Sequence, residues 1–264
     1  MRKISLLMVA IALFAGLFGN LTAEVSAATW IDVAQVDKGI VKVTYPVKSN
    51  VSTKVMIARG TEKYTYSLYG AETFPLQLGN GKYEISVLEH VSGKSYKRVA
   101  HQEVVLALGA DQQVFLNSVQ NVKWNNKNAA IIKAKELTKN LKTDAEKVKA
   151  IYEYVYKTIN YDNKLAETVA NNYIPNIDST LKTKLAICYD YSTLTAAMLR
   201  SVDIPAKLVM GQSAYVDVYH AWNEVFVDGK WVIIDTTVDA GLHKNGKKFQ
   251  MAKEASKYKV EKVY

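Results

Sequence analysis

The spacing of apolar residues changes near Gly109, and this change constrains the fold more than any other feature of the chain. Before it, apolar and polar residues alternate, as in Val41 to Tyr45, which is the period of a half-buried strand. After it, apolar residues recur at helical spacing, as in Val148 to Val155. The sequence therefore predicts an α+β protein with a strand-rich first part and a second part that contains helices.

The first part predicts a small immunoglobulin-like β-sandwich over residues 28–110. About seven short strands follow one another at a spacing of roughly 8–12 residues. Turn signals separate them at residues 37–39, 79–81 and 92–94. His90 and His101 have neither acid nor thiol neighbours in the sequence, so we interpret them as surface or packing residues.

The N-terminus has the pattern of a secretory signal peptide. Arg2 and Lys3 precede the 15-residue, almost wholly apolar stretch from Ile4 to Phe18, and small residues follow at Val25-Ser26-Ala27. We predict a signal peptide over residues 1–27, cut after Ala27 or the next alanine. An uncleaved anchor is the alternative, but the apolar run is short against the roughly 20 residues of a spanning helix. We expect a secreted or cell-envelope-associated protein with no integral membrane span after cleavage.

Composition narrows the expected partners. The chain has 264 residues, which is enough for one large domain or two ordinary ones, and 49% of them are hydrophobic. Its net charge is +9. This excess of positive charge has two interpretations. It predicts attraction to an anionic cell envelope or acidic polymer, or it only reflects charged residues on a solvated surface. The lysines are scattered and no nucleic-acid motif is present, so nucleic acid is not expected as a partner. We expect a protein or peptide substrate, with a cell-envelope component as one candidate.

Helical signals dominate the second part up to Pro205. Residues Asn125–Leu141 have a helical pattern, and Thr143 with Glu146 forms a capping box that begins the next helix. A polar stretch over residues 160–178 predicts a long loop, either irregular throughout or with a short helix in it, and this loop is a candidate cleft wall. A third helix is expected over Cys188–Val202, because the residues before Pro205 leave the helical region.

Cys188 is the only cysteine of the chain, which excludes a disulfide framework. Its two interpretations are a buried structural residue and a reactive thiol. It is expected in or just before the first turn of its helix, where unpaired N–H groups and the helix dipole favour a thiolate. Asp190 in the same turn would oppose a thiolate if it faced the sulfur, so we expect its side chain to point elsewhere.

His220 and Asp235 complete a candidate catalytic set. Strands are predicted over residues 206–211, 220–227 and 230–235, with a hairpin turn at Asp228-Gly229. His220 would open one hairpin strand and Asp235 would close the other, so the two would lie side by side. Cys188, His220 and Asp235 then suit a nucleophile, a base and the group that orients the base. A metal site would need a second close-spaced ligand pair, so neither a metal nor a cofactor is expected.

These residues stand in motifs that resemble the transglutaminase-like superfamily of papain-type folds. The motifs are Ala-Ile-Cys-Tyr-Asp-Tyr-Ser, His-Ala-Trp-Asn-Glu-Val and Ile-Asp-Thr-Thr, and the resemblance covers about residues 133–239. It implies a catalytic domain over residues 111–264 in which a helix that begins with the cysteine packs on an antiparallel sheet. The chain departs from the family at Ala186 and Asp203, where glycine is usual, and Ala186 bears on substrate fit.

The resemblance implies acyl transfer on peptide or glutamine carboxamides. Cys188 would attack the carbonyl, and His220 would protonate the leaving amine or ammonia. The Cys188 N–H is a candidate oxyanion donor, and Gln212 and Tyr215 are candidates for the second donor. Trp222 would either cover the site or pack in the core.

The acceptor of the acyl group decides the reaction, and the sequence leaves it open. Our first interpretation is hydrolysis, as in a peptidase or amidase. Transfer to a lysine amine would instead make the protein a γ-glutamyltransferase that forms cross-links. A non-enzymatic envelope-binding protein, in which the sandwich is the working part, is the third hypothesis. The basic tail from Gly241 is expected to end in a last strand over residues 257–264.

Overall fold

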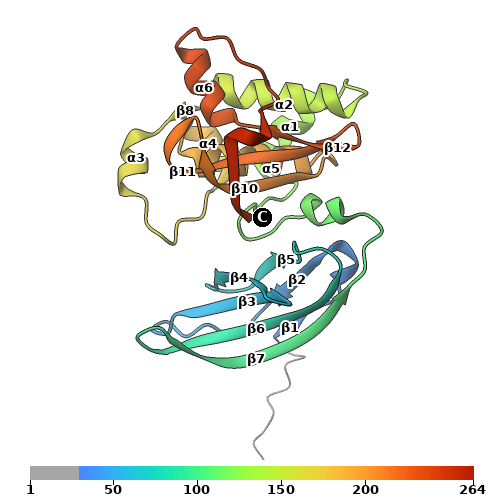
Figure 1. The fold of residues 1–264 in the computed structure, drawn as a ribbon, viewed down its shortest axis with the longest axis vertical. Coiled ribbons are helices and arrows are strands. Elements are labelled where there is room, and N and C mark those ends of the chain that lie inside the picture. The colour runs from blue at the N-terminus through green and yellow to red at the C-terminus, as the bar shows by residue number, and fades with distance from the viewer. Residues whose placement is uncertain (1–29) are drawn as a thin grey trace, which may run out of the picture.

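The computed structural model describes residues 30–264 and contains a strand-rich N-terminal half and a mixed α/β C-terminal half (Figure 1). The predicted signal peptide, residues 1–27, lies outside the described residues. Across the described part of the chain, none of the helices has the length and apolar character needed to cross a membrane.

The N-terminal half consists of two antiparallel sheets, with strand orders β1-β2-β5 and β4-β3-β6-β7. Alternation along β3 and β6 places Val55, Ile57, Tyr83 and Ile85 in the core with full burial. The last two strands are 12 residues long each, longer than the short strands expected from the sequence. The strands are β1 (Ile31–Asp32), β2 (Ile40–Val43), β3 (Thr53–Arg59), β4 (Glu62–Ser67), β5 (Glu72–Pro75), β6 (Gly81–Ser92) and β7 (Ser95–Leu106), with the 3-10 helix η2 (Val36–Lys38) between β1 and β2.

The connection between the halves contains a 3-10 helix, η3 (Asp111–Leu116), and leads to α1 (Ala129–Thr138). This first α-helix starts later than the predicted Asn125. Asn128 has an extended backbone, and its side chain accepts a hydrogen bond from the Asn125 N–H, so these residues form a turn.

The C-terminal half is built on an antiparallel sheet of order β12-β11-β10-β13. The two outer strands of this sheet differ in origin, since β12 closes a hairpin with β11 and β13 comes from the end of the chain. The remaining elements are α2 (Asp144–Thr158), β8 (Asn160–Tyr161), α3 (Asn163–Thr168), α4 (Ile177–Thr183), β9 (Leu185–Ala186), α5 (Cys188–Arg200), β10 (Ala206–Ser213), β11 (Val216–Val227), β12 (Lys230–Ile234), α6 (Thr236–Lys244), η4 (Ala255–Lys257) and β13 (Tyr258–Val263).

Two helices give this half its frame. The capping box at the start of α2 is formed in both directions, with the Glu146 N–H donating to Thr143 and the Glu146 carboxylate accepting from the Thr143 N–H. Helix α5 is buried from Asp190 to Arg200 and packs on β10 and β11. Its end turns at Asp203, which has a left-handed φ of 65°, the conformation that favours the glycine expected there from the family.

Arg200 joins three segments beneath the sheet. Its guanidinium is 2% exposed and donates to the carbonyl oxygens of Asn117, Ala206 and Tyr264 at 2.7–2.9 Å. Burial lowers the pKa of Arg200 to about 9. A buried guanidinium that donates from each of its three nitrogens to a carbonyl oxygen ties the connection, β10 and the end of the chain after β13 to one another.

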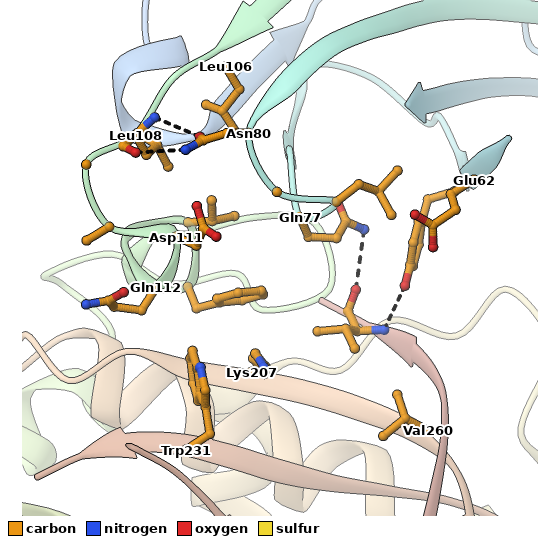
Figure 2. A pocket seen from close by; sticks show the side chains of 18 of the residues that line it. Glu62, Gln77, Asn80, Leu106, Leu108, Asp111, Gln112, Lys207, Trp231 and Val260 are labelled. Carbon is orange, nitrogen blue, oxygen red and sulfur yellow. Dashed lines mark hydrogen bonds between the residues drawn. The ribbon is translucent and has the colours of Figure 1, made fainter. Parts of the chain in front are cut away.

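The end of the chain lies between the halves (Figure 1). The Val263 N–H donates to the Tyr64 hydroxyl at 3.1 Å, and the Gln77 amide donates to the Val263 carbonyl at 3.3 Å (Figure 2). The Tyr264 ring packs edge-on against Tyr64 and Tyr66. Strand β13 therefore contacts the N-terminal half at its end while it completes the C-terminal sheet.

A cavity of about 1130 Å³ lies at this junction (Figure 2). Lys207 and Trp231 line it from the C-terminal half, and Gln77 and Leu106 line it from the other. The Lys207 ammonium lies 3.9 Å from the centroid of the Trp231 indole and pairs with Glu224. Neither Cys188, His220 nor Asp235 lines this cavity, so the candidate catalytic residues lie elsewhere.

Candidate active site

Cys188 is the first residue of α5 and is partly exposed. Asp190 holds this helix start, because one of its carboxylate oxygens accepts the Ile187 N–H at 2.9 Å and the other accepts the Tyr173 hydroxyl at 2.6 Å. Burial raises the pKa of Asp190, and these two hydrogen bonds act in the opposite direction. Both carboxylate oxygens thus have partners other than the thiol.

His220 lies within β11, opposite Gly211 of β10, and its side chain is 2% exposed. Its Nε2 is 2.8 Å from Oδ2 of Asp235, whose side chain is fully buried. The Cys188 side chain also lies close enough to the imidazole to raise the pKa of His220. The structure thus brings together the thiol, the imidazole and the carboxylate that the sequence singled out.

The charge balance at His220 favours an imidazolium. Burial lowers the pKa of this histidine, but the hydrogen bonds and negative charges of Asp235 and Cys188 outweigh burial and raise it to about 9. A protonated imidazole beside a thiol stabilises the thiolate, which is the nucleophilic form.

The hairpin geometry differs from the prediction, and Asp235 reaches His220 from outside the strand. Strand β11 begins at Val216, so His220 does not open it, and β12 ends at Ile234. The register pairs Asn223 with Ile234, which leaves Asp235 level with Trp222 instead of His220. Asp235 is the N-cap of α6, and the chain turns into a helix there, so its side chain reaches His220 diagonally.

The N-cap position also fixes the Asp235 side chain. Its Oδ1 accepts the Val238 N–H at 3.0 Å, which leaves Oδ2 for the imidazole. One turn further along α6, the buried Asp239 accepts hydrogen bonds from Tyr152 of α2 and from Lys253. These contacts hold α6 against α2, and therefore hold the helix end that carries Asp235.

Tyr258 is a site residue that the sequence reasoning did not identify. Its hydroxyl donates to Oδ2 of Asp235 at 2.9 Å, the same oxygen that bonds His220. Burial and the neighbouring Asp235 charge raise the pKa of Tyr258, so the phenol stays protonated. The sequence predicted a last strand here. No local signal shows that this strand pairs with β10, and that pairing is what brings Tyr258 to the site.

Replacing Tyr258 with Phe is expected to lower kcat roughly tenfold and to move the alkaline limb of the pH–rate profile upward from about pH 9. Without the phenol, the Asp235 carboxylate interacts more strongly with the imidazolium, which then loses its proton at higher pH. The pH dependence of kcat measures this shift. An unchanged pH limb together with lower thermal stability would reduce Tyr258 to a packing residue.

The close approach of β13 to β10 requires a glycine. A β-carbon at Gly211 would overlap the carbonyl oxygen of Lys259, so no larger side chain fits between the two backbones. Gly211 is also the register partner of His220 and Val260. This position therefore lets β13 pair beside the strand next to His220 and present Tyr258 to Asp235.

The remaining predicted site residues fall in different places. Trp222 is fully buried, stacks with His220 at a centroid distance of 6.2 Å and contacts the Tyr258 ring, so it packs behind the imidazole and does not cover the site. Gln212 is exposed and paired with Lys259. Tyr215 is 43% exposed and lines a cavity that His220 also lines.

This second cavity, the cleft, has a volume of about 920 Å³. Its walls come from the end of α2, β8, the first part of β11 and α6. Within residues 30–264, no group of three or more His, Cys, Asp or Glu side chains is arranged to hold a metal ion.

The fold and the site describe an α/β protein with antiparallel sheets. It carries a thiol, an imidazole and a carboxylate close to one another. Residues 133–236 match the family model of the transglutaminase-like superfamily. This match covers less than half of the chain and shows a transglutaminase-like segment at residues 133–236.

Two curated relatives match part of the chain. The chain is 29% identical over 117 residues to the kyphoscoliosis peptidase of Homo sapiens and 28% identical over 117 residues to that of Mus musculus. Each alignment covers 40% of this chain and 18% of the relative, so the chain spans less than a fifth of the proteins it matches.

Two solved structures match a larger share of the chain at lower identity. A candidate cysteine protease from Cytophaga hutchinsonii is 18% identical with a TM-score of 0.44, and the match covers 72% of this chain and 65% of that one. The red sea bream transglutaminase is 11% identical with a TM-score of 0.34, and the match covers 75% and 47%.

Proposed function

We propose that the protein is a thiol-dependent acyl-transfer enzyme that acts on peptide or glutamine carboxamides. One observation carries the proposal: a buried imidazole is bonded to Asp235 at 2.8 Å and also neighbours the thiol of Cys188. Cys188 is the nucleophile, His220 the general base and acid, and Asp235 the group that orients the imidazole. The transglutaminase-like segment supports a thiol-dependent enzyme in general.

The reaction begins when the Cys188 thiolate, beside the protonated imidazole of His220, attacks the carboxamide carbon. The carbonyl π electrons move to the oxygen, and a tetrahedral intermediate forms. Collapse of the intermediate breaks the C–N bond, and the imidazolium gives its proton to the leaving amine or ammonia. A thioester on Cys188 remains. In hydrolysis, His220 deprotonates water and the hydroxide attacks the thioester carbon. The C–S bond then breaks, the carboxylic acid leaves, and the thiolate of Cys188 and the imidazolium of His220 are restored.

The start of α5 supplies an oxyanion donor. The first N–H groups of a helix have no acceptor within the helix, and Cys188 is the first residue of α5. We assign its backbone N–H to the developing oxyanion. Tyr215 is the better of the two side-chain candidates for the second donor, because it lines the cleft with His220 and Gln212 does not.

Hydrolysis is the reaction that we propose, with γ-glutamyl cross-linking on the same residues as the alternative. The curated relatives that match part of the chain are named peptidases, which favours water as the acceptor. We also propose that the protein is secreted or envelope-associated after loss of residues 1–27. Residues 28–110 would then form an immunoglobulin-like sandwich beside a catalytic domain over residues 111–264.

The mass of the product tests this proposal. The chain from residue 28 is incubated with a peptide that contains a central glutamine and with a free primary amine, and Cys188→Ala is the matched control. Peptide fragments, or a carboxylic acid in place of the amide, indicate hydrolysis, and an amine adduct with loss of ammonia indicates cross-linking. No product from any peptide of a broad library, or equal product from Cys188→Ala, would contradict thiol-dependent acyl transfer.

A further inference from the structure

The charged residues that line the cleft beside His220 all carry basic groups. They are Lys157, His220, His243, Lys244 and Lys247, and no aspartate or glutamate lines the cleft. Most of the basic residues come from the end of α6 and the loop after it, and α6 packs beside β8 (Figure 1). A cavity with walls of one sign of charge attracts ligands of the opposite sign.

Two of these lysines carry a charge that the protein does not neutralise. Lys157 pairs with Glu153 at 2.7 Å, which offsets its charge. Lys244 and Lys247 are exposed, and neither takes part in the ion pairs found among residues 30–264. Their ammonium groups are therefore free to bind an anionic group in the cleft.

The end of α6 would repel an anion if its last carbonyl groups were unpaired, because a helix C-terminus carries partial negative charge. The carbonyl groups of Gly241, Leu242 and His243 have donors. The Gly246 N–H donates to His243 at 3.0 Å, and the Lys247 N–H donates to Leu242 at 2.9 Å. A ligand at this end of the cleft is therefore close to lysine ammonium groups, and the carbonyl oxygens of Leu242 and His243 are already hydrogen-bonded.

The length of α6 sets the separation between Lys244 and Asp235, the residue that bonds His220. Asp235 caps the start of the helix, and Lys244 is its last residue. At a rise of about 1.5 Å per residue, these ends lie roughly 13 Å apart along the axis. An extended peptide advances about 3.4 Å per residue, so roughly four residues span this distance. Tyr161 and Tyr215, both partly exposed, line the cleft and can contact a bound peptide.

We propose that the cleft binds acyl-donor peptides with acidic side chains, which Lys244 and Lys247 hold about four residues from the reacting carboxamide. This inference rests on the proposed function, because the carboxamide at Cys188 defines the position of the acidic side chains. The lysines act on the substrate through charge, and they take no part in bond breaking. The expected effect therefore falls on peptide binding and KM, with kcat little changed.

Peptide binding to Cys188→Ala protein tests the proposal without any chemistry. Three fluorescent peptides with a central glutamine are compared by anisotropy: one with two glutamates about four residues before it, one with two glutamates as far after it, and one with glutamines at all those positions. One glutamate peptide is expected to bind roughly tenfold more tightly than the all-glutamine peptide at low salt. The difference should shrink as the ionic strength rises.

Variants assign the effect to the two lysines. Lys244→Glu with Lys247→Glu, made in the Cys188→Ala background, is expected to remove the preference for the glutamate peptide. Lys94→Glu with Lys139→Glu changes the net charge equally at exposed positions that do not line the cleft, and it should keep the preference. A milder pair, Lys244→Gln with Lys247→Gln, guards against loss of folding, and thermal unfolding checks every variant.

The outcomes separate this inference from the proposed function. Equal binding of the three peptides, or a preference that survives in both Lys244 and Lys247 variants, overturns the acidic-peptide assignment and leaves acyl transfer untouched. A preference that disappears in those variants supports it. If the protein shows the preference but forms no product through Cys188, the acidic-peptide site is supported and the proposed acyl-transfer reaction is contradicted.

Discussion

Asp235→Asn is expected to lower kcat by about a thousandfold to ten-thousandfold. Oδ2 of Asp235 bonds His220 Nε2 at 2.8 Å and the Tyr258 hydroxyl at 2.9 Å. An asparagine amide cannot accept both bonds and also keep its Oδ1 contact with Val238. The imidazole would then lose the partner that orients it and supports its protonated form. Steady-state kinetics on a peptide found by the library screen measures the loss.

Asparagine is the informative substitution at this position because it separates catalysis from helix capping. Asparagine and aspartate are about equally good N-caps, so α6 should remain capped in the variant. Asp235→Ala serves as the comparison, since it removes the cap as well and should cost about 1 kcal/mol of stability more. If Asp235→Asn kept kcat within a few-fold of wild type, Asp235 would be a structural cap and its catalytic role would be wrong.

The alkylation rate of Cys188 by iodoacetamide at pH 6.5 is expected to fall at least tenfold in His220→Ala. His220 has a pKa raised to about 9 by Asp235 and Cys188, so below that pH the imidazole carries a positive charge beside the sulfur. This charge stabilises the thiolate at neutral pH and disappears as the pH rises through about 9. The two proteins should therefore react at similar rates above pH 9.5, where free thiols are ionised.

The chain offers a matched control for this measurement. His243 also lines the cleft but is exposed, and it contacts the Tyr156 ring instead of the thiol. His243→Ala should therefore alkylate at the wild-type rate at every pH. The reagent modifies a single thiol, because Cys188 is the only cysteine. Equal rates for wild type and His220→Ala at pH 6.5 would indicate a dormant or structural cysteine and direct attention to the N-terminal half.

Much of the architecture follows from local patterns that can be read from the sequence. The change of period near Gly109 predicted strands before helices, and within residues 30–264 seven strands precede α1. The capping box at Thr143 and Glu146 predicted the start of α2, because its hydrogen bonds join residues three apart. The start of α1 was predicted too early, since Asn125 and Asn128 bond each other and form a turn that periodicity does not reveal.

The candidate site depended on both kinds of information. The residue types and their motifs selected Cys188, His220 and Asp235, and the hairpin turn suggested that the last two lie close. The actual contact arises differently, because Asp235 leaves the strand register and caps α6. The position of Trp222 could not be predicted either. Alternation along a strand shows which residues share a face, but it does not show which face meets the cleft.

The sequence by itself determined the α+β order of the chain, the start of α2 and the three reactive residue types, since all of these depend on nearby residues. Only the tertiary structure decided that β13 lies beside β10, that Tyr258 bonds Asp235, and that Lys244 and Lys247 line the cleft with His220. The physical reason is separation along the chain. Strand pairing and cavity walls join segments whose neighbours are chosen by packing of the whole core, and no local pattern encodes that choice.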